Sequence, residues 1–255
     1  AVPFGPLLAW KRGDLYAVGQ RLFAAFAGAL AVMLLSYLFV DRISVAAALG
    51  LGLAAWLLLG AVTDLVLKSG LPGVRMGVAL RRLAGLPRSV FGTALAHAGL
   101  GLTVLGIVSV TTLEVEHFVT MKPGETMEIA GGTLRFDGIS PFQGPNYTED
   151  RGRFTYAVGG VPRGQIVSAK RLYTARQMPT TEAGIMTRGF SQLYVSLGDP
   201  TPDGGIVVRA WWKPLVTLIW LGCLVMMAGG TLSLLDRRLR VGAPMRARKT
   251  ALASA

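Results

Sequence analysis

Long runs without a charged residue alternate with short polar connections along this chain. Four such runs are about 20 residues long or longer: 22–40, 43–62, 89–113 and 214–235. An α-helix rises about 1.5 Å per residue, so about 20 apolar residues cross the roughly 30 Å hydrocarbon core of a bilayer. Each run therefore predicts a transmembrane helix, and the first three lie in a membrane region of residues 1–113.

The pattern changes between the third and the fourth run. Residues 114–213 contain short runs of β-branched and aromatic residues, separated by Gly-Gly, Asp-Pro and Asp-Gly signals for turns. The predicted strands are 133–136, 153–158, 165–169, 193–197 and 206–212. The sequence therefore predicts an integral membrane protein with four transmembrane α-helices. A small antiparallel β-rich domain, a sandwich or a barrel, is inserted between spans three and four.

Charge predicts which side of the membrane each part occupies. The 255 residues carry a net charge of +12, and the excess lies in three basic segments: before the first span, between the second and third spans, and after the fourth. The positive-inside rule makes these segments cytoplasmic and places residues 114–213 outside. Residues 236–255 then form a basic cytoplasmic tail, and we expect 241–255 to be disordered. Since the basic residues flank the spans, we expect them to contact membrane lipid and not nucleic acid.

Several common kinds of site have no support in the sequence. Cys223 is the single cysteine, so the chain has no internal disulfide and no Cys-x-x-Cys pair. Phosphate-loop, zinc-protease and hydrolase-elbow motifs do not occur in it. Glu149 and Asp150, beside Arg151, are expected in a solvated loop. Asp64 is expected to mark the boundary of the second span, which argues against a transporter or a proton-conducting subunit.

His97 is the strongest candidate for a functional side chain. It lies in the third span, with no other ionisable residue between Arg88 and Glu114. An imidazole in hydrocarbon needs a partner, which could be a hydroxyl group on a neighbouring helix, a proton path or a metal. Small residues near it on the helix leave room for a porphyrin, and histidines on helices are recurrent haem ligands. The alternative is a hydrogen bond that serves helix packing. His117, just past the third span, is interpreted as an ordinary interfacial residue.

A succession of short motifs resembles the C-terminal part of the CcmF family, the membrane subunit of the bacterial cytochrome c haem lyase. The resemblance covers nearly the whole chain. The motifs are Pro3-Phe4-Gly5-Pro6, Leu134-Arg135-Phe136-Asp137-Gly138, Gln143-Gly144-Pro145-Asn146-Tyr147, Lys170-Arg171-Leu172-Tyr173, Met178-Pro179-Thr180-Thr181-Glu182, Leu193-Tyr194-Val195-Ser196-Leu197-Gly198-Asp199-Pro200 and Leu232-Ser233-Leu234-Leu235-Asp236-Arg237-Arg238.

The resemblance implies a protein of system I cytochrome c maturation, in the bacterial cytoplasmic membrane with residues 114–213 in the periplasm. Members of this family take haem from the chaperone CcmE and, with CcmH, promote its attachment to apocytochrome c. They also bind haem b within the membrane through two histidines on different helices. His97-Ala98-Gly99 matches the second of these positions, so the resemblance makes His97 an axial ligand of the haem iron.

The sequence also departs from the family. The tryptophan-rich haem-handling segment, two periplasmic histidines and the first membrane histidine belong to an N-terminal portion that these 255 residues do not contain. We therefore expect a truncated copy, a fragment of a longer product or one half of a split protein, which supplies one of two haem ligands and is not catalytic alone. The rival hypothesis is a structural scaffold that docks partner subunits, in which His97 only packs.

Overall fold

The computed structural model describes residues 2–7 and 15–236. A 3₁₀ helix, η1 (Val2–Leu7), precedes helices α1 (Leu15–Phe39), α2 (Val45–Ser69), α3 (Met76–Ala84) and α4 (Arg88–Leu113); helix α5 (Thr217–Leu234) follows the strands. In the described part of the chain, four helices are long and apolar enough to cross a membrane: α1, α2, α4 and α5. The predicted tail falls almost entirely on residues 237–255, which lie outside the described residues.

The four uncharged runs fall on these helices, but the boundaries differ by up to seven residues, most at the start of α1 and the end of α2. Helix α1 begins at Leu15, seven residues before the predicted start, and α2 continues to Ser69. Helix α3, which was not predicted, has an apolar and a basic side and buries Ala79 completely. Both boundary differences arise because a few charged residues, such as Arg21 and Lys68, lie within helices whose other positions are mostly apolar.

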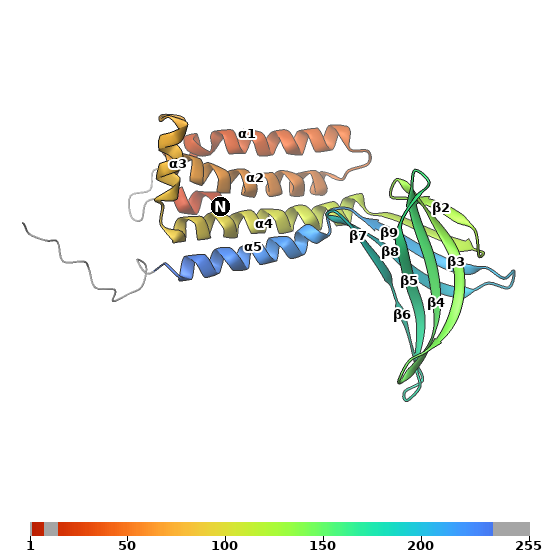
Figure 1. Ribbon diagram of the computed structural model, residues 1–255. Helices are drawn as coiled ribbons and strands as arrows, with labels where there is room; N and C mark the ends of the chain where they lie inside the picture. The colour runs from red at the N-terminus through yellow and green to blue at the C-terminus, as the bar shows by residue number, and fades with distance from the viewer. Residues whose placement is uncertain (1, 8–14, 237–255) are drawn as a thin grey trace, which may run out of the picture. The chain divides into compact units, whose positions relative to one another are not determined.

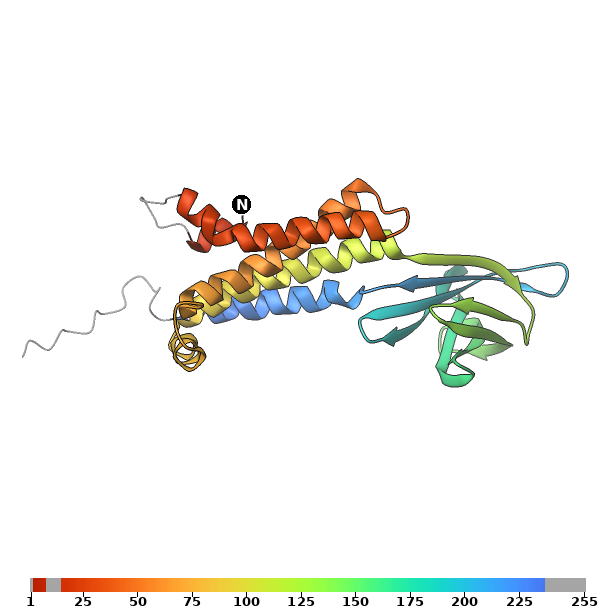
Figure 2. The ribbon, with the colours of Figure 1, turned by 90° about the horizontal axis from the view of Figure 1, so that it is seen from above.

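The chain divides into two compact units. The first comprises the described parts of residues 1–32, 52–101 and 222–255, and the second comprises residues 33–51 and 102–221. In the first unit, α4 and α5 lie side by side, as both views show (Figures 1 and 2). A Cβ added to Gly99 would lie 2.6 Å from the carbonyl oxygen of Gly222 in α5. One added to Gly92 would lie 2.6 Å from that of Gly229. Glycines seven residues apart on both helices therefore allow a close backbone approach, as is typical of helices packed in a membrane.

Helix α2 packs against α4 through a different face of α4. A Cβ on Gly101 would lie 2.8 Å from Cγ of Leu58 and 3.2 Å from Cβ of Leu57. Gly99 faces α5 and Gly101 faces α2, as expected because residues two apart on an α-helix point in nearly opposite directions. The end of α5 also contacts the start of α4, where the backbone N–H of Ser89 donates to Oδ2 of Asp236 at 3.0 Å.

The second unit contains a β-sandwich of nine strands. They are β1 (Val115–Met121), β2 (Thr126–Ile129), β3 (Gly132–Gln143), β4 (Tyr147–Val158), β5 (Val161–Tyr173), β6 (Met178–Glu182), β7 (Gly184–Arg188), β8 (Ser191–Pro200) and β9 (Ile206–Lys213). One antiparallel sheet has the order β1-β9-β8-β7 and the other β2-β3-β4-β5-β6. The five predicted strands all lie within these elements, while β1, β2, β6 and β7 were not predicted. The β-rich segment is thus an antiparallel sandwich.

The sandwich core forms where the inward-facing residues of the two sheets meet. Leu134, Phe136, Phe154 and Tyr156 come from the larger sheet, and they pack against β8 and β9 residues such as Val195. The register of β3 and β4 shifts between Phe136 and Gly138, and Gly138 takes a φ of +125°, which favours glycine at this bulge. The bulge therefore sets which side chains in the rest of β3 face outward.

Candidate functional sites in the helices and the sandwich

His97 lies on the side of α4 that faces α2. It comes four residues, about one helical turn, before Gly101, which contacts α2, and it is half-buried. Among the described residues, no hydrogen bond or ion pair reaches its imidazole. The charges of Asp64 and Lys68 on α2 do act on it electrostatically. The ring is therefore available to a ligand or to a partner outside the described residues.

Asp64 differs from its expected role as a boundary residue. Helix α2 continues for five residues beyond it, and Asp64 is only 3% exposed. Its Oδ2 accepts a hydrogen bond from Nζ of Lys68 at 2.7 Å, while its Oδ1 is buried without a hydrogen-bond partner. The sequence pattern could not show this burial, because Lys68 one turn later resembles the polar end of a helix.

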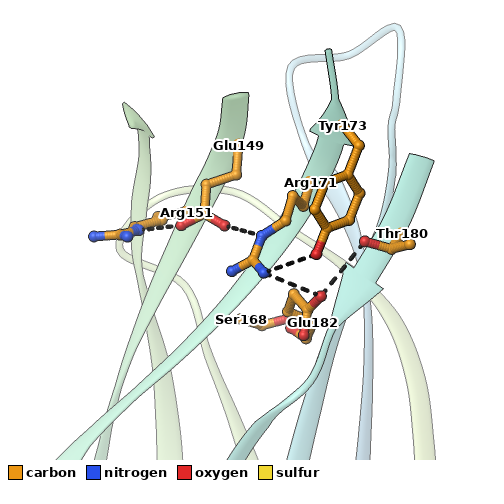
Figure 3. Close-up of polar contacts among 7 residues, drawn as sticks. All are labelled: Glu149, Arg151, Ser168, Arg171, Tyr173, Thr180 and Glu182. Carbon is orange, nitrogen blue, oxygen red and sulfur yellow. Dashed lines mark hydrogen bonds and ion pairs between the residues drawn. The ribbon is translucent and has the colours of Figure 1, made fainter. Parts of the chain in front are cut away.

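A second candidate site lies on the outer face of the larger sheet, around Glu149 (Figure 3). Glu149 was expected in a solvated loop, and this prediction is wrong. Glu149 belongs to β4, pairs with Phe142 of β3 and Arg171 of β5, and is only 5% exposed. A loop was inferred from the run of charges, but alternate residues of that run point to opposite faces of a strand.

Two arginines hold the Glu149 carboxylate. Nε of Arg151 donates to Oε1 at 2.5 Å, and Nε of Arg171 donates to Oε2 at 2.8 Å. Arg171 also donates through Nη1 to the hydroxyl of Tyr173 at 3.3 Å and lies 3.5 Å from Oε1 of Glu182. Figure 3 shows these side chains meeting across β4, β5 and β6. Both carboxylate oxygens of Glu149 are thus paired, as burial of a charge requires.

Aromatic rings cover the same two guanidinium groups. The Arg151 guanidinium lies 3.3 Å from the ring centroid of Phe142, and that of Arg171 lies 4.0 Å from the centroid of Tyr147. The Tyr147 and Tyr173 rings are 5.9 Å apart in an edge-on arrangement. Stacking restricts the rotamers of both arginines. We define the Glu149 face as Phe142, Tyr147, Glu149, Arg151, Arg171 and Tyr173.

Electrostatics at the Glu149 face follow from this geometry. Burial on its own would raise the pKa of Glu149, but the hydrogen bonds from Arg151 and Arg171 outweigh it and hold that pKa below its usual range. The hydrogen bond to Tyr173 and then that to Glu149 raise the pKa of Arg171. Glu149 therefore stays ionised at neutral pH between the two guanidinium groups.

A multi-pass membrane protein with a β-sandwich domain is the class that these features define. Residues 112–214 match the family model described as the CcmF C-terminal β-sandwich. The chain is 64% identical over 248 residues to the cytochrome c-type biogenesis protein CycK of Rhizobium meliloti strain 1021, covering 97% of this chain and 37% of that protein. It is 30% identical over 237 residues to the cytochrome c-type biogenesis protein CcmF of Escherichia coli K12, covering 92% and 35%.

A solved structure of the cytochrome c haem lyase CcmF has the same fold. It matches with a TM-score of 0.66 at 20% sequence identity, covering 92% of this chain and 37% of that one. Residues 112–214 are thus a CcmF C-terminal β-sandwich, and over nearly its whole length the chain is similar to the C-terminal part of CcmF proteins, as the motifs had indicated. It spans a little over a third of the length of these relatives.

Proposed function

We propose that this chain forms the C-terminal part of a cytochrome c haem lyase in the bacterial inner membrane, with the β-sandwich on the periplasmic side. In this proposal His97 is one axial ligand of a haem b, and the second comes from an N-terminal family portion. The assembled protein receives haem from CcmE and works with CcmH on apocytochrome c. Haem supplies the electron-transfer chemistry, while the chain holds and orients it.

The placement of His97 is the observation that carries the proposal. Its imidazole is half-buried in an apolar helix, and within the described residues it has no hydrogen-bonding partner. One neutral imidazole nitrogen suits haem iron, so this side chain fits an axial position. The second ligand is assigned to the N-terminal family portion on the family resemblance, in which the two histidines lie on different helices.

Haem content tests the proposal directly. The chain is co-expressed with an N-terminal portion of a relative, the complex is purified, and its reduced pyridine-haemochrome spectrum is recorded. We expect His97→Ala to abolish the b-type spectrum while the complex still assembles. His117→Ala is the matched control, because His117 lies in β1 opposite Ala210 and should leave the haem content unchanged. Haem retained by His97→Ala would refute the ligand assignment.

A scaffold without haem ligation is the second candidate, and the Glu149 face favours it. Two stacked arginines on an outer sheet face form a preorganised surface of the kind that partner proteins bind. The same purified samples distinguish the two functions. Unchanged haem together with loss of the complex in His97→Ala would support the scaffold.

A further inference from the structure

The described helices contain one buried side-chain oxygen without a hydrogen-bond partner, Oδ1 of Asp64. A buried carboxylate oxygen without a hydrogen bond loses its hydration and gains nothing in return. Lys68 pairs only with Oδ2, at 2.7 Å, and Oδ1 is buried with no partner. A donor that reaches Oδ1 would remove this cost, and the facing side of α4 carries one in the imidazole of His97.

Asp64 and His97 lie on facing sides of α2 and α4, at nearly the same depth. Gly101 of α4 meets Leu57 and Leu58 of α2. Asp64 comes two turns after Leu57, so it lies on the same face of α2, and the two helices run antiparallel. Measured along the helix axes from the level of Gly101, His97 lies about 6 Å away and Asp64 lies about 10 Å away in the same direction. The levels of the two residues therefore differ by about 4 Å.

The directions of the two side chains reduce this difference further. The Cα–Cβ bond of a helical residue tilts toward the N-terminus of its own helix. For His97 the tilt is toward the level of Asp64, and for Asp64 it is toward the level of His97, because the helices are antiparallel. The charge of Asp64 already acts on the imidazole. The two side chains therefore converge between α2 and α4.

We infer that Asp64 is a positioning residue for His97: its Oδ1 accepts a hydrogen bond from the imidazole N–H that faces away from the iron. This inference rests on the proposed function, since it requires the other imidazole nitrogen to bind haem. A carboxylate partner fixes the tautomer and the orientation of a ligating histidine and makes it a stronger donor. It also satisfies the oxygen that Lys68 leaves unpaired. Ferric haem, with the higher charge, gains more from the stronger donor than ferrous haem does.

The test compares Asp64→Asn and Asp64→Ala with wild type in the purified complex with the N-terminal portion. Asn has nearly the same shape as Asp and removes a buried charge, so the variant is expected to fold. We expect Asp64→Asn to keep haem. Compared with wild type, the ratio of its affinity for ferric haem to its affinity for ferrous haem should fall about tenfold. This corresponds to a rise of about 59 mV in midpoint potential for a one-electron couple. Asp64→Ala should weaken haem retention roughly 10–100-fold. Asp41→Asn, at an exposed acid between α1 and α2, is the matched control and should change neither value.

Each outcome separates this inference from the proposed function. Loss of haem in His97→Ala together with a raised potential in Asp64→Asn supports both. If His97→Ala loses haem but both Asp64 variants keep the wild-type potential and haem content, the role of Asp64 is overturned. His97 then remains a ligand. Retention of haem by His97→Ala overturns the ligand assignment, and the inference with it. A midpoint potential does not depend on the amount of protein, and haem content is compared per mole of folded complex, so a change in yield affects neither comparison.

Discussion

Replacing Glu149 by Gln tests whether the Glu149 face is held together by a buried charge. Gln keeps the shape of the side chain and one carbonyl oxygen, but it removes the negative charge. The Nε of Arg151 or of Arg171 then faces an amide NH₂ group instead of an oxygen. Arg151 loses its counter-ion and Arg171 loses the nearer of its two, within a surface where rings and strands restrict their movement.

The structure sets the size of the effect. A hydrogen bond to a charged group contributes about 1.5–3 kcal/mol, and removal of one partner of a buried ion pair costs about 3–5 kcal/mol. The side chains of Arg151 and Arg171 are 34% and 22% exposed, so water replaces part of what is lost. We therefore expect about 3 kcal/mol, at the lower end of that range. At about 1.4 kcal/mol per factor of ten, this is roughly a hundredfold change in the local opening equilibrium.

Hydrogen exchange of the full chain in detergent micelles measures this equilibrium. We expect amide protection in the paired ends of β4 and β5 to fall roughly a hundredfold in Glu149→Gln. Glu182→Gln is the matched control, since Glu182 also contacts Arg171 but its side chain is 47% exposed. An exposed ion pair contributes less than about 1 kcal/mol. Equal protection in the two variants would refute the assignment of Glu149 as the buried anchor of this face.

The pH dependence of the same difference is a second check. Because the folded-state pKa of Glu149 is lowered, its contribution is complete above the unfolded-state pKa, near about 4, and is lost as the pH falls through the folded-state pKa. The difference between wild type and Glu149→Gln should therefore be the same at about pH 5 and about pH 7 and shrink below about pH 4. A difference that grows on acidification would contradict this reasoning.

Two further predictions concern helix packing and sidedness. In Gly99→Ala, the new Cβ would lie 2.6 Å from the backbone of α5, so we expect a cost of about 1–3 kcal/mol, measured as a shorter half-life at elevated temperature in detergent. Gly230→Ala, where a Cβ meets nothing within 4 Å, should be neutral or stabilising. In a Cys223→Ser background, an impermeant maleimide should label Thr148→Cys in intact spheroplasts but label Gly77→Cys only after permeabilisation. The opposite labelling would reverse the proposed orientation.

The sequence predicted the parts of the fold that depend on composition and local pattern. Uncharged runs identified four helices, and β-branched runs identified five strands, because each signal is contained in a short window. The remaining strands were missed where the pattern is weak, as in β6 with Pro179 and two threonines. The Glu149 face was missed for a different reason. Glu149 and Arg171 are 22 residues apart and meet only through the register of β4 and β5.

The connection between the sandwich and its helices explains why glycine is needed where they meet. Helix α4 ends at Leu113 and β1 begins at Val115, while β9 ends at Lys213 and α5 begins at Thr217. Strands β1 and β9 are paired neighbours, and neighbouring strands lie about 5 Å apart, whereas packed helix axes lie about 8–10 Å apart.

Two helices that continue from adjacent strands therefore begin their contact closer together than ordinary side chains permit. A Cβ on Gly106 would lie only 2.8 Å from the backbone nitrogen of Ile219, in the first turn of α5. Glycine at this position resolves the mismatch between strand spacing and helix spacing. The ion pair of Glu114 and Lys213, at 3.0 Å, joins the same two connections. The strand pairing thus sets how closely α4 and α5 must approach at this end, and a larger residue at Gly106 would have to separate either the helices or the strands.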